Sequence, residues 1–234
     1  MAQKKLQRFA DIKTFANVLE YPVDMKGKWK GFFKNDSPVI LELACGRGEY
    51  TAGLAKLFPH QNFIGIDVKG NRMYIGAKKC LTENIPNAGF LRSQIEKLTD
   101  YFSPGEVDEI WITFPDPQLR ISKAKKRLTH PRFLRLYQHI LKPGGHIHLK
   151  TDSPDLYLFT KKVAGLYSLT IVEDSDDIYA NKEVKDELKI KTHYESLDIA
   201  QSKKIHYLKF TLPDKIKNID DQLQKILRDE EQLD

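Results

Sequence analysis

Short apolar runs recur along the chain and are separated by longer spacers. They occupy residues 39–43, 63–67, 89–91, 109–114 and 146–150. In the spacers, apolar residues fall at helical intervals, as in Met73, Ala77 and Leu81 and again across 133–141. This spacing predicts helices between strands, and the sequence Lys-Pro-Gly-Gly at 142–145 ends the second of these helices.

Strands that alternate with helices predict a mainly parallel sheet with helices on both faces. Two later apolar runs, 168–172 and 206–212, extend the sheet to seven strands. The last strand is expected to pair antiparallel at the edge, as in other mixed sheets. The predicted fold is therefore an α/β/α sandwich in three layers.

The two ends of the chain differ in character from the central part. Residues 1–36 form a basic arm with aromatic residues, which either packs on the domain or grips RNA. The predicted α/β domain covers 37–212. Residues 213–234 are acidic, and Ile216, Ile219, Leu223 and Ile226 fall at heptad-like spacing, which predicts an amphipathic helix. This helix docks either on its own domain or on a partner.

Composition favours a soluble protein that binds a polyanion. The chain has 234 residues, a formal charge of +6 and 41% hydrophobic residues, and no apolar run approaches the roughly 20 residues of a membrane-spanning helix. A basic balance favours nucleic acid over membrane. Without an apolar signal segment, a cytoplasmic location is expected. Cys45 and Cys80 are too few for a disulfide framework or a metal cluster.

A glycine turn follows the first predicted strand. Glu42 precedes Gly46 and Gly48, and a helical segment begins at Glu49 or Tyr50. Glycines at such a turn let a ligand approach the backbone, although the dinucleotide fingerprint spacing is absent. Asp67 ends the second strand, where a carboxylate can accept both ribose hydroxyls of a nucleoside cofactor or cap the next helix.

Residues 114–128 join a carboxylate to a run of cations. Asp116 lies between Pro115 and Pro117, which predicts a stiff, extended turn that holds the acid in place. Basic residues follow without an intervening acid: Arg120, Lys123, Lys125, Lys126 and Arg127, with Arg132 and Arg135 beyond them. The run is either a solvated face or a surface that neutralises RNA phosphates.

These motifs together resemble the bacterial tRNA (guanine-N7)-methyltransferase family, over about residues 38–212. The similar segments include 41–48, 64–67, 114–117, 126–128, 131–134, 141–145, 150–152 and 192–195. The resemblance implies a class I methyltransferase (Rossmann-like) fold, S-adenosyl-L-methionine as cofactor and N7-methylguanosine formation in the variable loop of tRNA. It also implies a catalytic role for Asp116.

The resemblance also implies the remaining site residues. The cofactor would contact Glu42, Gly46, Asp67, Gln94 and Asp116, and the substrate would contact Arg120, Asp152, Thr192 and Glu195. Simpler roles remain open, because Asp152 is placed to cap the following helix and Thr192 with Glu195 has the spacing of a capping box. No metal is expected, since His146 and His148 lack a third ligand.

The chain departs from the family pattern at three positions. Gln118 stands where the family usually has Trp, Arg120 where it has Lys, and Ala44 where glycine is common. The loss of Trp leaves open how the turn at Asp116 is braced.

Methylation at guanine N7 needs no prior proton removal, so catalysis is expected from alignment and electrostatics. Two other functions stay open. One is methylation of an exocyclic amine of another nucleic acid or of a small molecule, and the other is a non-catalytic RNA-binding module. Either a monomer or a homodimer is compatible with the sequence.

Overall fold

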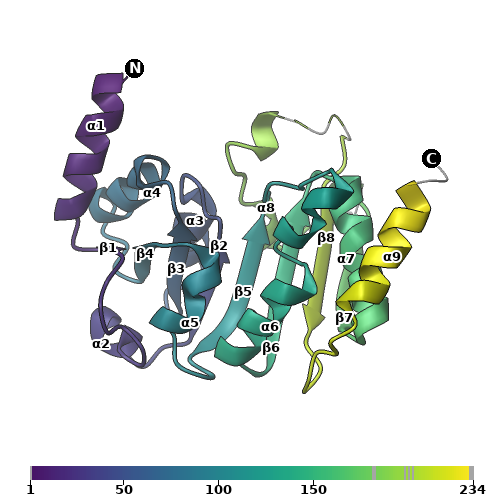
Figure 1. Cartoon of the computed structure of the whole chain (residues 1–234). Coiled ribbons are helices and arrows are strands. Elements are labelled where there is room, and N and C mark those ends of the chain that lie inside the picture. Colours follow the sequence, from purple (N-terminus) through teal and green to yellow (C-terminus); the bar gives the residue numbers. More distant parts are fainter. Residues whose placement is uncertain (1, 181–182, 198, 200, 202, 232–234) are drawn as a thin grey trace.

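An eight-stranded sheet forms the centre of the molecule in the computed structural model, which describes residues 2–180, 183–197, 199, 201 and 203–231 (Figure 1). The strand order is β1-β4-β3-β2-β5-β6-β8-β7. The strands are β1 Val18–Glu20, β2 Val39–Leu43, β3 Asn62–Asp67, β4 Ala88–Arg92, β5 Val107–Thr113, β6 Leu141–Thr151, β7 Thr170–Ser175 and β8 His206–Thr211.

The sheet confirms the expected α/β class. Strands β1 to β6 pair in parallel, whereas β8 runs antiparallel to both of its neighbours, β6 and β7. The sheet has eight strands instead of seven, because the short segment Val18–Glu20 pairs with β4. Only three residues form that strand, which is too short for a recognisable apolar run.

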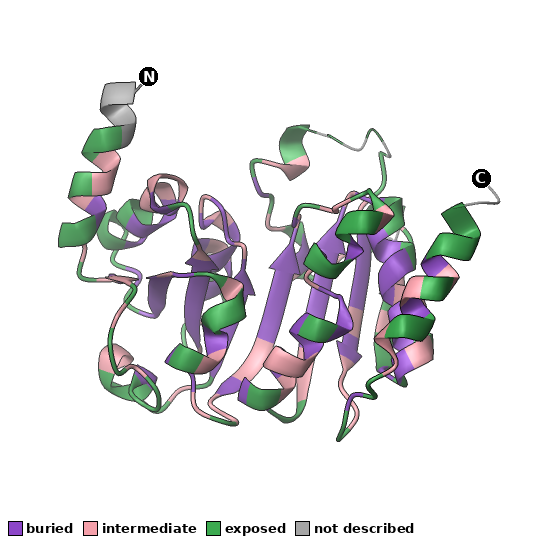
Figure 2. Ribbon diagram, in the orientation of Figure 1, coloured by how far each residue is buried: buried purple, intermediate pink, exposed green. Residues whose placement is uncertain are grey.

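Helices cover both faces of the sheet, and Figure 2 shows the buried strands between their exposed outer surfaces. The α-helices are α1 Ala2–Asp11, α2 Trp29–Phe33, α3 Glu49–Leu57, α4 Gly70–Thr82, α5 Leu98–Tyr101, α6 Pro131–Ile140, α7 Pro154–Tyr167, α8 Asp186–Lys189 and α9 Asp220–Glu231. Short 3₁₀ turns are η1 Ile12–Thr14, η2 Ile95–Lys97, η3 Ile121–Lys126, η4 Ile178–Ala180 and η5 Glu195–Leu197. Each described helix is too short or too polar to cross a bilayer.

Strand β2 shows how the sequence builds the two layers. All five of its residues are buried, and successive side chains point to opposite faces. Leu41 and Leu43 join the cluster with α5, α6 and α7, whereas Ile40 joins the cluster with α3 and α4. A continuous apolar run is therefore required here, because both faces of a central parallel strand are covered.

The aromatic residues of the N-terminal arm pack on the domain. The Trp29 indole donates a hydrogen bond to the Tyr101 carbonyl at 2.9 Å, and its ring stacks on Phe102 with centroids 5.0 Å apart. Phe15 stacks on Tyr74 of α4. These contacts account for Trp29 and Phe15 through packing, whereas Tyr21 remains exposed.

The C-terminal helix α9 docks on its own domain. Leu223 and Leu227 are buried in the cluster that contains α6 and α7. The Asp220 carboxylate accepts hydrogen bonds from Arg135 at 2.6 Å and from the Tyr167 hydroxyl at 2.9 Å. The sequence had left open whether this helix docks on a partner, and these contacts favour the intramolecular alternative.

Candidate active site

In sheets of this kind the ligand crevice lies outside the carboxyl edge at the point where the strand order reverses, and here that is the edge toward which the β5 arrow points in Figure 1. From β2 the chain continues to β3 on one side, whereas β5 lies on the other side of β2. In such sheets, ligands bind where the strand order reverses, outside the carboxyl ends of the strands. The glycine turn after β2 and the Asp116 turn after β5 therefore flank the same crevice.

The turn after β2 adopts left-handed backbone conformations. Ala44, Gly46 and Gly48 have φ angles of 57°, 55° and 68°. A Cβ on Gly48 would lie 2.5 Å from the Phe90 ring, so this position requires glycine for packing as well as for conformation. Ala44 carries a Cβ in a region that glycine prefers, which explains why glycine is common there in the resembling family.

Asp67 connects the ends of β2 and β3. Its Oδ2 accepts a hydrogen bond from the Gly46 backbone N–H at 2.9 Å, and its Oδ1 accepts one from Lys69 N–H at 2.8 Å. The second contact lies just before α4, close to the capping role considered from sequence. Because an ionised carboxylate offers about four lone-pair sites, Asp67 retains acceptor capacity for ribose hydroxyls.

Glu42 is buried near the end of β2, and its carboxylate is hydrogen-bonded to residues of α3 and β5. Its carboxylate accepts from Thr51 N–H at 2.8 Å, from the Thr113 hydroxyl at 2.7 Å and from the Thr51 hydroxyl. Burial raises the pKa of Glu42 to about 7, although these hydrogen bonds act in the opposite direction. Glu42 thus ties the first turn of α3 to β5, which fixes the glycine turn between them.

Gln94 is exposed and lies two residues after the end of β4. It occupies the N-cap position of η2, but its side chain makes no capping hydrogen bond. The Gln94 side chain therefore does not cap this 3₁₀ turn.

The Asp116 turn is more strained than the sequence predicted. Phe114, expected to be extended before Pro115, has a φ of 47°, and Gln118 has a φ of 49°. Non-glycine residues in this region cost about 1–3 kcal/mol each and cluster at functional sites. The Phe114 N–H donates to the Lys150 carbonyl at 2.8 Å, and Asp116 Oδ1 accepts from Gln118 N–H at 3.0 Å. Asp116 itself is exposed.

Arg127 corrects the expectation that the whole basic run faces RNA. It is buried, and its guanidinium donates to the carbonyls of Pro117, Gln118 and Leu119 at 3.2 Å. It also lies 4.4 Å from the ring centroid of Phe159. Arg127 is therefore part of the protein interior, whereas Arg120, Lys123, Lys125 and Lys126 are exposed.

Arg135 is likewise engaged within the protein, through its ion pair with Asp220. Arg132 is exposed and lies 3.5 Å from Glu96. The cationic face that remains consists mainly of the four exposed residues at 120, 123, 125 and 126.

Lys150, at the carboxyl end of β6, is fully buried and was not predicted as a site residue. Its ammonium donates to the carbonyls of Leu188 and Ile190 at 2.8 and 2.9 Å and to the Glu195 carboxylate at 2.9 Å. Burial lowers the pKa of Lys150, and Glu195 partly offsets this effect. A lysine at the end of an apolar strand was the only signal in the sequence.

Two predicted substrate residues make internal contacts around this lysine. Glu195 also accepts a hydrogen bond from the Tyr179 hydroxyl at 2.5 Å. The Thr192 hydroxyl accepts from Glu195 N–H at 3.1 Å, which is one half of a capping box. The other half does not form, because the Glu195 carboxylate points to Lys150 and Tyr179.

Asp152 follows β6 and is half-buried. The cap of α7 is Ser153, whose hydroxyl accepts from Leu156 N–H at 3.3 Å. The alternative role of Asp152 as the cap of this helix is therefore wrong.

Residues 193 and 194 bring the 192–195 motif over the glycine turn. The Tyr194 ring lies 3.5 Å from the position of a Cβ on Gly46, and its hydroxyl is hydrogen-bonded by Arg72. His193 N–H donates to the Glu49 carboxylate at 2.9 Å. The fold therefore joins two motifs that are about 145 residues apart, a contact that no local pattern predicts.

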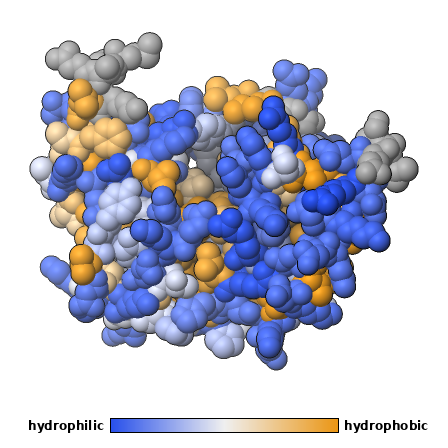
Figure 3. Space-filling view, in the orientation of Figure 1, coloured by the Kyte–Doolittle hydropathy of each residue, from blue (hydrophilic) through white to orange (hydrophobic). Residues whose placement is uncertain are grey.

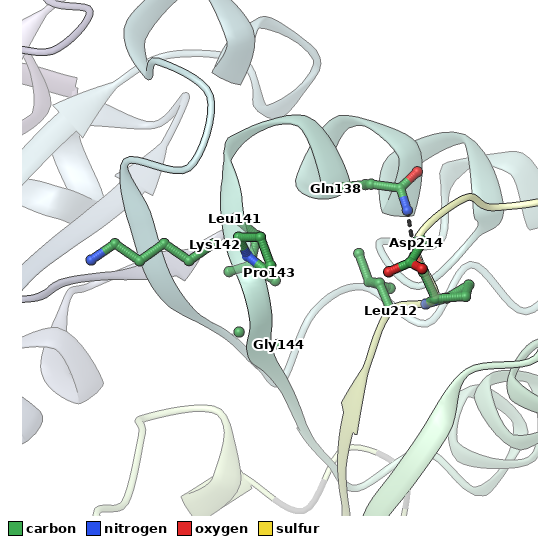
Figure 4. A pocket seen from close by; sticks show the side chains of 9 residues that line it. Gln138, Leu141, Lys142, Pro143, Gly144, Leu212 and Asp214 are labelled. Atoms are coloured by element: carbon green, nitrogen blue, oxygen red, sulfur yellow. Dashed lines mark hydrogen bonds between the residues drawn. The ribbon is translucent and has the colours of Figure 1, made fainter.

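Two cavities lie away from this crevice. One, of about 160 Å³, is lined by Leu141, Lys142 and Asp214 at the opposite edge of the sheet, where Gln138 donates to the Pro213 carbonyl (Figure 4). The other, of about 300 Å³, lies between β7 and α8. The face shown in Figure 3 is mostly hydrophilic with scattered apolar patches. Chemistry and topology, rather than cavity size, identify the site.

Among the described residues, no group of three histidine, cysteine or acidic side chains is arranged to hold a metal. His148 is buried, with Nδ1 2.7 Å from the Tyr207 hydroxyl and Nε2 2.8 Å from Glu109. It serves as a core histidine.

Comparisons with known proteins give a consistent result. A family model described as "Putative methyltransferase" matches residues 36–208. The chain is 46% identical to the tRNA (guanine-N(7)-)-methyltransferase of Bacteroides thetaiotaomicron, over 91% of this chain and 87% of that protein. It is 49% identical to the protein of the same name from Porphyromonas gingivalis, over 86% of each chain.

Solved structures support the fold. A 30S ribosomal A1408 methyltransferase from an uncultured bacterium superposes with a TM-score of 0.59 at 22% identity, over 82% of this chain and 95% of that one. The 16S rRNA methyltransferase KamB superposes with a TM-score of 0.62 at 16% identity, over 84% and 99%. At these identities the likeness concerns the fold alone.

Proposed function

This chain belongs to the tRNA (guanine-N(7)-)-methyltransferase family, and on that premise we propose that it uses S-adenosyl-L-methionine to form N7-methylguanosine in the variable loop of tRNA. The observation that carries the proposal is that the glycine turn, Asp67 and the Asp116 turn lie at the carboxyl ends of neighbouring parallel strands, where the strand order reverses. The exposed cations that follow Asp116 supply a surface for RNA.

The residues around the glycine turn fit a nucleoside cofactor. The Tyr194 ring lies 3.5 Å from the position of a Cβ on Gly46, so a ligand at this turn would pack against that ring. Asp67 keeps lone pairs for two ribose hydroxyls. The N-terminus of α3 directly follows the turn, so its first backbone N–H groups and its dipole favour binding of the carboxylate of the cofactor's methionine part. We propose that Glu42 acts mainly by holding this turn and that Gln94 faces the base of the cofactor.

The bound cofactor supplies an activated methyl group, whose bond to sulfur breaks as a bond to guanine N7 forms. The N7 lone pair is available at neutral pH, so no residue has to remove a proton. Positive charge moves onto the purine as the new bond forms, and the carboxylate of Asp116, which is exposed, would stabilise it. The Gln118 N–H donates to Asp116 Oδ1 and so limits the orientations of that carboxylate, which reduces the loss of conformational entropy when the carboxylate is oriented for the reaction.

The substrate RNA would be held in two ways. Arg120, Lys123, Lys125 and Lys126 would neutralise phosphates, which positions RNA without specifying a base. Asp152, Thr192 and Glu195 would contact the target nucleotide; for Glu195 this requires sharing its carboxylate with Lys150 and Tyr179.

We also propose a cytoplasmic location, a monomer or homodimer, and a functional division at 1–36, 37–212 and 213–234.

Replacement of Asp116 tests the proposal. With labelled S-adenosylmethionine and unmodified tRNA, the wild-type protein should place the methyl group on guanine N7 of the variable loop. Asp116→Asn should lower kcat by about 100-fold or more, which is the effect on kcat of removing one electrostatic contact to a transition state in other enzymes. Asp214→Asn is a matched control, because Asp214 is an exposed acid at the opposite edge of the sheet.

Other outcomes would select other functions. Full activity in Asp116→Asn would remove this residue from catalysis. Label on an exocyclic amine would replace N7 as the target atom, and tRNA binding without cofactor binding by calorimetry would indicate a non-catalytic RNA-binding module.

A further inference from the structure

Arg127 holds three consecutive carbonyl groups of the turn that carries Asp116. Its Nε donates to the carbonyls of Pro117 and Gln118, and its Nη2 donates to those of Gln118 and Leu119, all at 3.2 Å. The side chain is buried, with 5% of the residue exposed. One guanidinium therefore holds the backbone of the three residues that follow Asp116.

The turn needs such a brace because its backbone is strained. Phe114 and Gln118 both have positive φ angles, and neither is glycine. Such conformations persist only where surrounding contacts determine them. On the β6 side, Phe114 N–H is held by the Lys150 carbonyl at 2.8 Å; on the other side, the corresponding contacts come from Arg127.

The local helix explains why Arg127 turns inward. It directly follows η3, a 3₁₀ helix in which side chains three residues apart lie on the same side. Ala124 is buried, and Arg127 lies three residues beyond it. The Phe159 ring of α7 then covers the guanidinium at 4.4 Å. The basic residues between them, Lys125 and Lys126, stay exposed.

We propose that Arg127 is a positioning residue for methyl transfer, which acts by holding the 117–119 backbone so that the Asp116 carboxylate faces the reacting purine. The inference rests on the proposed function of Asp116. It assigns Arg127 no contact with RNA, in contrast to the exposed cations beside it. A planar fork with several donors can bond adjacent carbonyls at once, whereas an ammonium acts as a single point charge.

Two measurements separate positioning from phosphate binding. The first is kcat at saturating tRNA and cofactor, where Arg127→Lys should lower the rate by about 100-fold, the effect of misplacing a catalytic group by about 1 Å. The second is the salt dependence of tRNA binding. Arg127→Ala, which removes the charge, should leave its slope unchanged, whereas Lys125→Met should reduce that slope by about one, as expected for a lost phosphate contact.

Controls address folding. Arg228→Lys makes the same chemical change at an exposed position of α9 and should leave kcat and the melting temperature unchanged. Arg127→Ala opens space beside the three carbonyls, so millimolar guanidinium should restore part of kcat, whereas equal ammonium or potassium chloride should not. This rescue also keeps the test informative if the variant is less stable, because salts that only stabilise the fold would act alike.

The proposal is overturned if Arg127→Lys retains the wild-type kcat, or if the salt slope of Arg127→Ala falls as in Lys125→Met. Failure of guanidinium to raise kcat in folded Arg127→Ala also counts against it. These results differ from failure of the proposed function, in which the wild-type protein would place no methyl group on guanine N7 and Asp116→Asn would change nothing.

Discussion

Replacement of Glu42 by glutamine should stabilise the protein above neutral pH and have little effect in mild acid. Glu42 is 3% exposed, and burial raises its pKa from 4.5 to about 7. One pKa unit corresponds to about 1.4 kcal/mol, so a shift of this size corresponds to about 3 kcal/mol. This is the free energy by which burial of the charged carboxylate opposes folding once the group is ionised in both states.

The direction follows from proton uptake. Because the folded-state pKa is raised, the folded protein keeps a proton on Glu42 at pH values where the unfolded chain has lost it. The contribution to stability is therefore fully present below pH 4.5 and is lost as pH rises through about 7. Glutamine cannot ionise, so Glu42→Gln should not show this loss.

The assay is urea unfolding of both proteins at several pH values between 4 and 9. Other titrating groups cancel in the difference between the two proteins, so only residue 42 contributes to its pH dependence. The variant should match the wild type near pH 4 and exceed its free energy of unfolding by about 3 kcal/mol at pH 8. Glutamine can still accept from Thr51 and donate to the Thr113 hydroxyl, so the local hydrogen bonds are preserved.

A constant difference across this pH range would refute the reasoning, because Glu42 would then titrate alike in the folded and unfolded states. A difference that shrinks with rising pH would show that hydrogen bonds to the charged form outweigh desolvation. Calorimetry with S-adenosylmethionine adds a second test. If Glu42 acts only by holding the turn, the variant should keep its cofactor affinity.

Two further substitutions address backbone strain and the buried ion pair. Ala44→Gly should raise the urea midpoint by an amount equivalent to about 1 kcal/mol, since it removes a Cβ from a residue with φ of 57°; an unchanged or lower midpoint would contradict this. Lys150→Met should cost about 3 kcal/mol in urea unfolding by leaving Glu195 without its buried partner, and the double variant Lys150→Met/Glu195→Leu should recover most of the loss. If Glu195 contacts the substrate, the rate of methyl transfer should remain below that of the wild type in the double variant. Recovery of the wild-type rate would mean that the role of Glu195 is limited to its ion pair with Lys150.

Much of the fold follows from local patterns in the sequence. The apolar runs predicted the strands that form the carboxyl edge, and helical spacing predicted α4 and α6. The positions of Asp67 and Asp116 then follow, because Asp67 ends β3, Asp116 lies three residues after β5, and the carboxyl ends of these parallel strands meet at one edge. Periodicity is informative here because the strands are buried on both faces.

The contacts around Lys150 and Arg127 could not be predicted in the same way. Lys150 binds carbonyls about 40 residues away in a segment without strong periodicity. Charge alone placed Arg127 with its neighbours in an exposed basic run, whereas the 3₁₀ geometry of η3 turns it inward with Ala124. The spacing of three between these two residues was the available signal, but a short basic segment gives no reason to prefer a period of 3.0 over 3.6.

The internal contacts of Lys150 and Arg127 affect the electrostatics around Asp116. The Lys150 charge is paired with Glu195, and the Arg127 donors are directed to the carbonyls of the catalytic turn. Neither group is therefore directed at a purine beside Asp116, where a cation would oppose the positive charge that methylation creates. RNA phosphates would instead meet the exposed cations of the segment that follows the turn. If Asp116 has the proposed role, this separation would let one short segment attract a polyanion while keeping a carboxylate beside the base, where it would favour the positive charge of N7 methylation.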